Sequence, residues 1–492
     1  MSILVIDIGT TSMRGILYDK DGKRLAMYRE ENHLIFMGDS RIEENPDDWY
    51  ENTVKIIRSI VQQSGVNDFE AIAVTAQRSS MIPVDENGRP LSAAIMWQDT
   101  RNRDICNALS RYNDMLYQKT GAEVSTVFSG SKMTWIRKNL PDVYAHTYKF
   151  LNIPEYVVFR MSGSFVSDTT YASRTGLMDL RTAAWDKDLL DLYEVEEEKL
   201  CRLVQPGEIA AYVNAEFAET AGILKGIPII HAGGDQQCAA IGHGIIEPGP
   251  VSVTAGTGGF IAAALKTLPE TLPKGMIINR SSIKNEYIME TNVLSCGAAY
   301  DWCARQLYGM DKPDYAKLES ELNHENFVSS VLVLPYFSGR GAPEWNPMAK
   351  AVFSGITTAT RRSEIFKSIM ESIFMEISLQ IDYLSTVSQI DRVNLGGGLS
   401  GSKTLNQLQA DIYGRPVYTS DDPEATANGA LITCLCGLGR YGSFSEAYND
   451  LYGSIQPNMF VPDLCLHEQY LKKRAEMNRL YEVLKEGDSY ES

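Results

Sequence analysis

A unit of one buried strand, one glycine-rich turn and one returning strand occurs twice in this chain. Its ranges are Ile3–Ile8, Gly9–Ser12 and Arg14–Asp19 in the first copy, and Val251–Thr254, Ala255–Gly259 and Phe260–Leu265 in the second. Short apolar runs bounded by glycine turns are typical of strands in a sheet core. A repeated supersecondary unit indicates that two parts of the chain fold alike. We therefore expect an α/β fold with two related domains facing one cleft.

The length of the chain and one segment rich in proline and glycine divide it near its middle. At 492 residues the chain is too long for a single hydrophobic core. The segment Glu247–Pro250, in which two prolines flank a glycine, is the best candidate for an interdomain linker. The predicted domains are therefore residues 1–246 and residues 247–492.

Strands alternate with helical segments along the rest of the chain, which is typical of mixed sheets with helical crossovers. The segments Arg14–Asp19 and Lys23–Tyr28 flank Asp21-Gly22, a strong hairpin signal. The charge run Glu194–Glu198 is predicted to start a solvated helix. The other predicted elements are helices over Pro46–Gln63, Arg362–Leu384 and His467–Glu486, a mainly helical part over Asn102–Asp191, strands over Ala71–Thr75 and Arg392–Leu395, and a helix from about Ser402.

The overall charge and the cysteine pattern exclude several classes of partner and location. A net charge of -17 argues against nucleic acid or an anionic membrane surface as a partner, although a few local donors can still bind a nucleotide. The N-terminus lacks the features of a signal peptide, and no run of about 18 apolar residues predicts a membrane span. The eight cysteines form no CxxC pair, so we expect reduced, buried thiols and a cytoplasmic protein. A homodimer is one oligomeric state that the sequence leaves open.

Three glycine-rich turns follow predicted strands and are candidates for phosphate binding. They are Gly9-Thr10-Thr11, Gly256-Thr257-Gly258 and Gly396-Gly397-Gly398. Such turns let backbone N–H groups approach phosphate oxygens, and threonine hydroxyls add donors. Each turn alone could equally be a simple tight turn, but three of them in one chain favour a nucleotide. No Walker motif is present.

The third turn also fits a different fingerprint. Gly396–Gly401 matches G-x-G-x-x-G between a strand and a helix, and Asp421 follows at the distance of the ribose-binding acid. This pattern makes a nicotinamide oxidoreductase an alternative hypothesis. We rank it lower because the unit lies close to the C-terminus, with little sign of further strand-helix pairs.

Two aspartates each close a strand beside glycines, and both could take part in phosphoryl transfer. Asp235 follows the apolar run Ile229–Ala232 and Gly233-Gly234, and it precedes a helix rich in small residues. One interpretation is that Asp235 is only the N-cap of that helix. Phosphoryl transfer needs a divalent metal, phosphate donors and a carboxylate that accepts the hydroxyl proton. Asp7, near Thr10 and Arg14, suits the metal side, and Asp235 suits the acceptor side.

Taken together, the motifs are similar to those of the FGGY family of carbohydrate kinases over nearly the whole chain. They are Asp7–Ser12, Trp97–Arg101, Gly233–Gln237, Gly256–Gly258, Pro335–Gly339, Gly396–Gly398 and Gln409–Ile412. The resemblance implies two actin-like ATPase domains of the ribonuclease-H type around a central cleft. It also implies ATP and Mg²⁺ as cofactors, with ATP bound mainly by the second domain and a small sugar or polyol by the first.

The resemblance also implies roles for individual residues. Asp235 would be the general base, and Asp7 the carboxylate on the magnesium side. The substrate-binding residues would be Gln77, Arg78, Gln236 and Phe260, and the cofactor-binding residues would be Thr10, Thr11, Arg14, Gly256, Thr257, Gly397, Gly398 and Ser402, the last at a position where glycerol kinases have an asparagine. From the residues alone, Arg78 could equally pair with a surface acid. Trp97 is predicted to lie in the core, and Asp99 with Arg101 to form a local salt bridge.

The substrate is expected to be larger than glycerol. The Gln77-Arg78 pair resembles glycerol kinase more than xylulokinase, but Ser79 and Val127 stand where glycerol kinases have Glu and Tyr. Losing two polar partners of substrate hydroxyls disfavours glycerol. We therefore expect a polyol or ketose of about four to six carbons. The alternatives are a xylulokinase or glycerol kinase proper and, more distantly, a non-metabolic ATPase of the actin fold.

Overall fold

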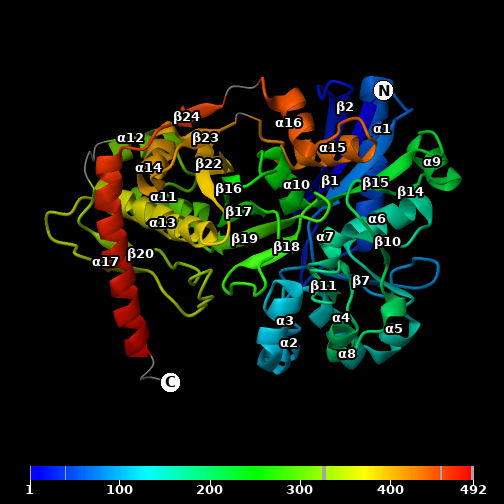
Figure 1. Cartoon of the computed structure of the whole chain (residues 1–492), viewed down its shortest axis with the longest axis horizontal. Coiled ribbons are helices and arrows are strands. Elements are labelled where there is room, and N and C mark those ends of the chain that lie inside the picture. Colours follow the sequence, from blue (N-terminus) through cyan, green and yellow to red (C-terminus); the bar gives the residue numbers. More distant parts are fainter. Residues whose placement is uncertain (1, 39, 324–327, 421, 455–456, 489–492) are drawn as a thin grey trace.

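The computed structural model describes residues 2–38, 40–323, 328–420, 422–454 and 457–488. Two large mixed sheets lie in two lobes of the molecule, with helices packed around both (Figure 1). Within these described ranges, the first sheet has six strands and the second has seven. The predicted α/β class with two domains is confirmed.

The first sheet runs in the order β14-β15-β6-β1-β2-β3. Its central strands are apolar on both faces and fully buried, because helices cover both sides. β1 is parallel to β6 and β6 to β15, whereas β1, β2 and β3 form an antiparallel meander. The bounds are β1 Ser2–Ile8, β2 Ser12–Asp19, β3 Arg24–Glu31, β6 Ala71–Ala76, β14 Ile209–Tyr212 and β15 Pro228–Gly234.

The second sheet repeats this topology, since its order is β18-β19-β17-β16-β22-β23-β24. The strands β16, β17, β19, β22 and β23 take the places of β1, β2, β3, β6 and β15, so the internal repeat is confirmed. The bounds are β16 Gly249–Ala255, β17 Gly259–Leu265, β18 Ile277–Arg280, β19 Tyr287–Val293, β22 Ile390–Gly396, β23 Val417–Thr419 and β24 Asn458–Phe460.

The predicted linker Glu247–Pro250 is partly wrong. Gly249 and Pro250 already belong to β16, where Pro250 pairs with Arg392 of the neighbouring β22. Proline is tolerated near the beginning of a strand, so its presence did not mark the end of ordered structure here. The connection between the two lobes at this point is the turn of residues 243–248.

Two long helices agree closely with their predicted ranges. α1 covers Pro46–Ser64 and has Asn45 as its N-cap, and α13 covers Arg362–Ser385. The other helices are α2 Arg103–Leu109, α3 Asn113–Thr120, α4 Ser129–Asn139, α5 Pro141–His146, α6 Ile153–Ser162, α7 Thr169–Ala172, α8 Lys187–Tyr193, α9 Ala215–Ala221, α10 Asp235–Gly242, α11 Gly297–Tyr308, α12 Tyr315–Asn323, α14 Lys403–Tyr413, α15 Ala425–Gly437, α16 Phe444–Tyr452 and α17 Leu464–Asp488.

The middle of the chain is less regular than predicted. No α-helix starts at Glu194–Glu198: Glu194 ends α8 in a left-handed conformation, and a single 3₁₀ turn covers Glu197–Lys199. The buried Val195 between them directs the chain inward and prevents a continuous solvated helix. Short strands outside the two main sheets are β4 Ile35–Phe36, β5 Ile42–Glu44, β7 Ile82–Val84, β8 Ala94–Ile95, β9 Lys149–Leu151, β10 Val166–Asp168, β11 Met178–Asp179, β12 Ala184–Trp185, β13 Arg202–Val204, β20 Leu332–Leu334 and β21 Val352–Ser354.

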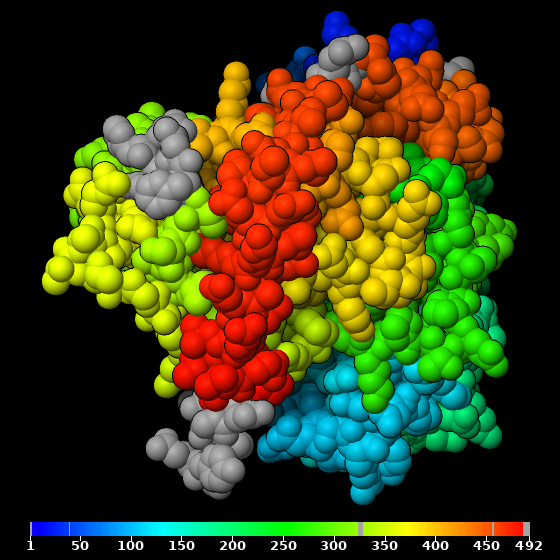
Figure 2. Space-filling model, turned by 60° about the vertical axis from the view of Figure 1, so that its left-hand side comes forward, coloured from blue at the N-terminus to red at the C-terminus, as the bar shows by residue number. Residues whose placement is uncertain are grey.

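The terminal helix α17 lies along the surface of the second lobe, as Figure 2 shows. Its residues Tyr470, Met477 and Tyr481 are buried in the core of that lobe, and Lys473 donates to buried Glu371 at 2.6 Å. The predicted docking of this helix is therefore confirmed. Among the described helices, none combines the length and the apolar character needed to cross a membrane.

The two lobes are joined by a close contact between α10 and α15. A side chain on Gly242 would overlap the carbonyl oxygen of Ala425, and one on Gly429 would overlap that of Cys238. Without Cβ atoms, the two helix backbones approach each other directly. α15 also packs its apolar face on the first sheet, although it belongs by sequence to the second half of the chain.

We expect Gly429→Ala to destabilise the protein, although alanine is the better helix former. The added methyl group must displace the backbone of α10, an overpacking that typically costs about 1–3 kcal/mol. The free energy of unfolding from denaturant titration measures this effect. Gly401→Ala is the control, because a Cβ there meets nothing within 4 Å. Equal stability of the two variants would contradict the close contact.

Candidate active site

The carboxyl ends of three adjacent parallel strands bring the predicted catalytic residues together. Asp7 at the end of β1 pairs in register with Thr75 of β6, and Thr75 pairs with Gly233 of β15. The other two strands lead directly into site residues: Arg78 follows β6, and Asp235 follows β15. Ligands of open α/β sheets bind at this edge.

Asp235 is the first residue of α10, and Gly234 holds the N-cap position, so the interpretation of Asp235 as N-cap is wrong. Its Oδ1 accepts a hydrogen bond from the backbone N–H of Gln236 at 2.8 Å and lies 3.5 Å from Nε of Arg78. Burial raises the pKa of Asp235 to about 6, against the opposing effect of Arg78. Its side chain is still 26 % exposed, so it can meet a ligand.

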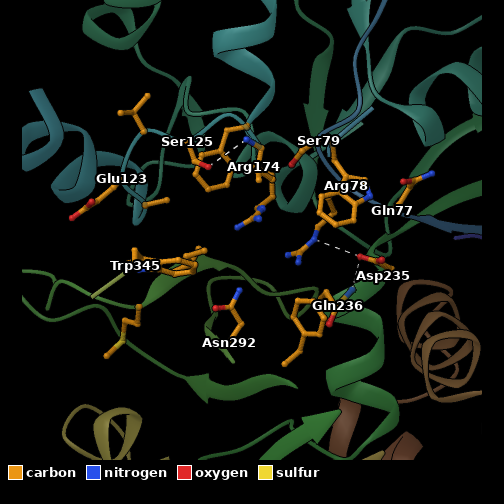
Figure 3. A pocket seen from close by; sticks show the side chains of 18 of the residues that line it. Gln77, Arg78, Ser79, Glu123, Ser125, Arg174, Asp235, Gln236, Asn292 and Trp345 are labelled. Carbon is orange, nitrogen blue, oxygen red and sulfur yellow. Dashed lines mark hydrogen bonds and ion pairs between the residues drawn. The ribbon is translucent and has the colours of Figure 1, made fainter. Parts of the chain in front are cut away.

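Asp235 opens onto a pocket of about 510 Å³ between the two lobes (Figure 3). Of the predicted site residues, the pocket brings together Thr10, Gln77, Arg78, Asp235, Gln236 and Phe260. Residues that sequence reasoning did not assign to the site also line it, including Trp97, Glu123, Ser125, Phe128, Arg174, Asn292 and Trp345. A pocket of this size holds a small organic molecule.

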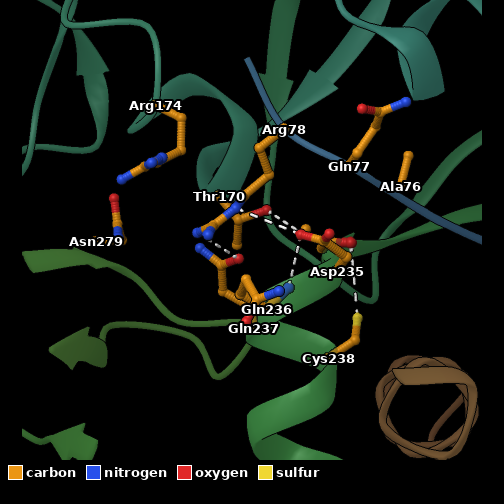
Figure 4. Close-up of polar contacts among 12 residues, drawn as sticks. Ala76, Gln77, Arg78, Thr170, Arg174, Asp235, Gln236, Gln237, Cys238 and Asn279 are labelled. Atoms are coloured by element: carbon orange, nitrogen blue, oxygen red, sulfur yellow. Dashed lines mark hydrogen bonds and ion pairs between the residues drawn. The ribbon is translucent and has the colours of Figure 1, made fainter. Parts of the chain in front are cut away.

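Arg78 bridges the two lobes. It donates to Glu290 of β19 at 2.8 Å and to Gln237 of α10 at 3.2 Å, and it lies next to Asp235 (Figure 4). Burial lowers the pKa of this guanidinium, but Glu290 and Asp235 more than offset that effect and hold the pKa above its usual value. The alternative that Arg78 pairs with a surface acid is wrong, because the side chain is only 10 % exposed.

Trp97 is a wall of the pocket, and its predicted place in the core is wrong. The ring is half-buried, and its Nε1 donates to Thr10 Oγ1 at 3.2 Å. Thr10 in turn donates to Gln77 Oε1 at 3.1 Å. An indole N–H needs a partner when it is buried, and here the glycine turn supplies it. The predicted local pair of Asp99 and Arg101 is confirmed, with Nε at 2.9 Å from Oδ1.

Asp7 and Arg14 face each other across the β1–β2 hairpin. Arg14 donates to Asp7 Oδ2 from Nε at 2.9 Å and from Nη2 at 2.6 Å, and it pairs with Glu424 at 2.9 Å. Burial raises the pKa of Asp7, while Arg14 lowers it. In the described ranges no three His, Cys, Asp or Glu side chains converge on a metal site. A single carboxylate still fits Mg²⁺, which takes most of its ligands from phosphates and water.

The predicted nucleotide-binding residues lie on the turns that follow β1, β16 and β22. Gly256 and Thr257 are exposed in the β16–β17 turn, and Thr11 is exposed in the first turn. Gly397 has a positive φ of 85° and packs against the backbone of Ala255, so the second and third glycine turns are neighbours. Gly398 follows in the turn before α14.

Ser402 is the N-cap of α14. Its Oγ accepts from Leu405 N at 3.2 Å and donates to Glu319 of α12 at 2.9 Å. Asp421 of the alternative dinucleotide fingerprint lies outside the described residues.

Buried Lys132 fixes the segment that forms one wall of the pocket. The side chain is fully buried on α4, and its Nζ donates to the carbonyls of Thr126 and Val127, each at 2.6 Å. Burial lowers the pKa of Lys132 to about 7. No sequence pattern pointed to a role for this lysine, because its partners are backbone oxygens.

The fold is two-lobed and of the actin-like type, and a pocket and the glycine turns lie at the cleft between the lobes, as in phosphotransferases of this fold. Residues 2–242 match the N-terminal domain of the FGGY family of carbohydrate kinases, and residues 251–438 match its C-terminal domain. The chain belongs to this family and is a carbohydrate kinase. The nicotinamide hypothesis is therefore wrong.

Known relatives agree with this assignment. The chain is 31% identical to a glycerol kinase from Treponema denticola over 485 residues, which cover 93% of this chain and 95% of the relative. The structure of a xylulose kinase from Rhodospirillum rubrum superposes with a TM-score of 0.92 at 22% identity, over 99% of both chains. A Plasmodium falciparum glycerol kinase with ADP superposes with a TM-score of 0.89 at 24% identity, over 98% of this chain and 97% of that one.

We expect Lys132→Met to destabilise the protein and to loosen the pocket wall. The substitution leaves two buried carbonyl groups without their donor, which costs about 1–3 kcal/mol. Denaturant titration measures the loss. Lys138→Met, at an exposed position of the same helix, is the matched control. Equal stability of both variants would show that the two hydrogen bonds of Lys132 contribute nothing.

Proposed function

We propose that this kinase transfers the terminal phosphoryl group of Mg²⁺·ATP to a hydroxyl of a polyol or ketose of about four to six carbons. The observation that supports it is the position of Asp235, at the start of α10, on the wall of a pocket that Arg78, Gln236 and Phe260 also line. Residues 1–246 would bind the sugar, and residues 247–492 would bind mainly the nucleotide.

In this proposal Asp235 takes the proton from the attacking hydroxyl. A general base works best when its pKa lies near the working pH, and the raised pKa of Asp235, about 6, meets that condition. Gln77, Arg78 and Gln236 would hold the sugar hydroxyls, and Phe260, which is 46% exposed, would cover the carbon chain. Closure of the lobes would exclude water, as kinases require to avoid hydrolysing ATP.

The phosphate groups would lie between the two hairpin turns. Thr10, Thr11 and Arg14 would act on the transferred phosphoryl group, and Gly256 and Thr257 on the nucleotide phosphates. Gly397, Gly398 and Ser402 would contact the adenosine. Mg²⁺ would neutralise charge on the phosphate oxygens, and Asp7 would hold it on the side of the first lobe.

The proposed preference for a substrate larger than glycerol rests on two positions of the pocket wall. Ser79 and Val127 both line the pocket and are smaller than the Glu and Tyr of glycerol kinases. The alternatives are a xylulokinase or a glycerol kinase proper. A non-metabolic ATPase is disfavoured, because it would not need the polar acceptor pocket beside Asp235.

The proposal also includes a cytoplasmic location. All eight cysteines are free thiols, and six of them are buried. Burial raises the pKa of Cys238 and Cys434, which keeps these thiols protonated and unreactive. A homodimer is compatible with the proposal, and sedimentation would test it.

A pH profile tests Asp235 as the base. The base must be ionised, so kcat/KM should rise about tenfold per pH unit below pH 6 and level off above it. Asp235→Asn should lower kcat about 10²- to 10⁴-fold and abolish this acidic limb. The measurement is ADP release in a coupled assay over polyols and ketoses, with ATP binding as the control for folding. Full activity of the Asn variant would refute the assignment.

Refilling the pocket wall tests the size preference. Ser79→Glu with Val127→Tyr should restore partners for the hydroxyls of glycerol and narrow the pocket. We expect kcat/KM for glycerol to rise about tenfold relative to that for a five- or six-carbon polyol. Val127→Phe, which adds bulk without the phenol, separates size from hydrogen bonding. An unchanged ratio in the double variant would rule out this account of specificity.

A further inference from the structure

Arg174 is a second arginine in the pocket, and the reaction proposed above makes no use of it. It follows the short helix α7 and is only 7% exposed. Figure 3 shows its side chain pointing into the pocket next to Arg78. Figure 4 shows the two arginines on the same side of Asp235.

The guanidinium of Arg174 has unused hydrogen-bond donors. Among the described residues, neither its Nε nor its Nη1 has an acceptor. The carboxylate oxygen Oε2 of Glu290 lies 3.8 Å from Nη1, which is too far for a hydrogen bond. Glu290 already accepts from Arg78 at 2.8 Å and from Asn279 at 2.9 Å. Because the Glu290 carboxylate is already paired with Arg78, it balances only part of the positive charge of Arg174.

The charge of Arg174 is consequently costly in this position. Burial and the neighbouring Arg78 together lower the pKa of Arg174 to about 9, because Glu290 and Asp235 offset only part of their effect. Buried charges in proteins are normally paired, because an uncompensated one is strongly unfavourable. An anionic group of a bound substrate would supply the missing partner.

The surroundings of Arg174 prepare it for a planar anion. Its Cζ lies 4.5 Å from the centre of the Phe128 ring, which supports the guanidinium from one side. This contact uses none of the N–H donors of Arg174 as a hydrogen bond. Two parallel N–H donors of arginine match the two oxygens of a carboxylate. The hydroxyl of Ser79, also a pocket residue, is buried and has no partner among the described residues. A single polar end of a substrate could accept from the N–H groups of Arg174 and bond with the hydroxyl of Ser79.

We propose that the substrate is a polyhydroxy acid, with its carboxylate on Arg174 and the reacting hydroxyl at Asp235. This inference rests on the proposed function and adds a terminal carboxylate to the proposed polyol chain, which makes the substrate an aldonate. A carboxylate is favoured over a phosphate, because one partly compensated guanidinium matches a single negative charge. A dianionic phosphate would need a further free cation, but the other arginine of the pocket, Arg78, is already paired with Glu290 at 2.8 Å, and the acid Glu123 also lines the pocket.

Matched pairs of ligands test the proposal in the intact protein. Binding of D-gluconate and D-glucitol, and of D-xylonate and xylitol, is measured by calorimetry on Asp235→Asn, which separates binding from chemistry. We expect each aldonate to bind about 10- to 100-fold more tightly than its alditol, the range of a charge-assisted hydrogen-bond pair. Alditol binding as tight as aldonate binding would overturn the proposal, and so would tighter binding of xylulose 5-phosphate.

Variants of Arg174 then localise the effect. In the same background, Arg174→Met should weaken aldonate binding at least about tenfold more than alditol binding. Arg103→Met, at an exposed position of α2, is the matched control and should leave the aldonate preference intact. An equal loss for both ligands would show that Arg174 is only structural. If Arg174→Met does not fold, Arg174→Lys keeps the charge but loses the fork, and should still reduce the aldonate preference.

Turnover by the unmodified enzyme separates this inference from the proposed function. Phosphorylation of neutral alditols without preference for aldonates would overturn only the carboxylate site. No ATP-dependent turnover of any polyhydroxy compound, neutral or acidic, would contradict the proposed function itself.

Discussion

The direct backbone contact of α10 with α15 is the constraint on which the rest of the structure depends. α10 presents Asp235 at its N-terminal end and joins the first sheet to the second at its C-terminal end. α15 comes from the other half of the chain but shares a buried apolar cluster with β1 and β6. Gly242 and Gly429 allow this approach, since any side chain there would overlap a carbonyl oxygen. The position of Asp235, the proposed base, is therefore set by a packing contact that lies away from the pocket.

The repeated sheet explains why the site forms at a cleft. In each lobe a glycine turn follows the first strand of the antiparallel meander, β1 or β16. The parallel neighbour of that strand, β6 or β22, ends at the same edge of the sheet. The first lobe places Asp7 there, and the second places Gly256 and Gly397. The two copies of this topology thus face each other across the cleft, each with the sheet edge at which ligands of such folds bind. A kinase needs this arrangement, because it must hold a nucleotide and an acceptor close together.

Sequence reasoning recovered the features that are local in the chain. The strand-turn-strand repeat, the helices at Pro46 and Arg362 and the aspartates at strand ends all have signals within a few residues. The errors concern burial and long-range pairing. The prediction that Trp97 lies in the core is wrong, because its hydrogen bond to Thr10 joins distant segments and has no local signal in the sequence. Glu290 and Arg174 lie in stretches without any motif, and only the folded chain brings them to Arg78.

Glu290 and Asp235 compete for Arg78, and this competition links the arrangement of the lobes to the pKa of Asp235, the proposed base. Arg78 belongs to the first lobe with Asp235, whereas Glu290 belongs to β19 of the second lobe. In the structure, Glu290 is the closer partner, at 2.8 Å against 3.5 Å for Asp235. A closer Arg78 would lower the pKa of Asp235 and weaken it as a base. An arrangement with the lobes further apart would free Arg78 to pair with Asp235. The cross-lobe ion pair therefore limits the effect of Arg78 on Asp235, so that burial can keep the pKa of this proposed base raised.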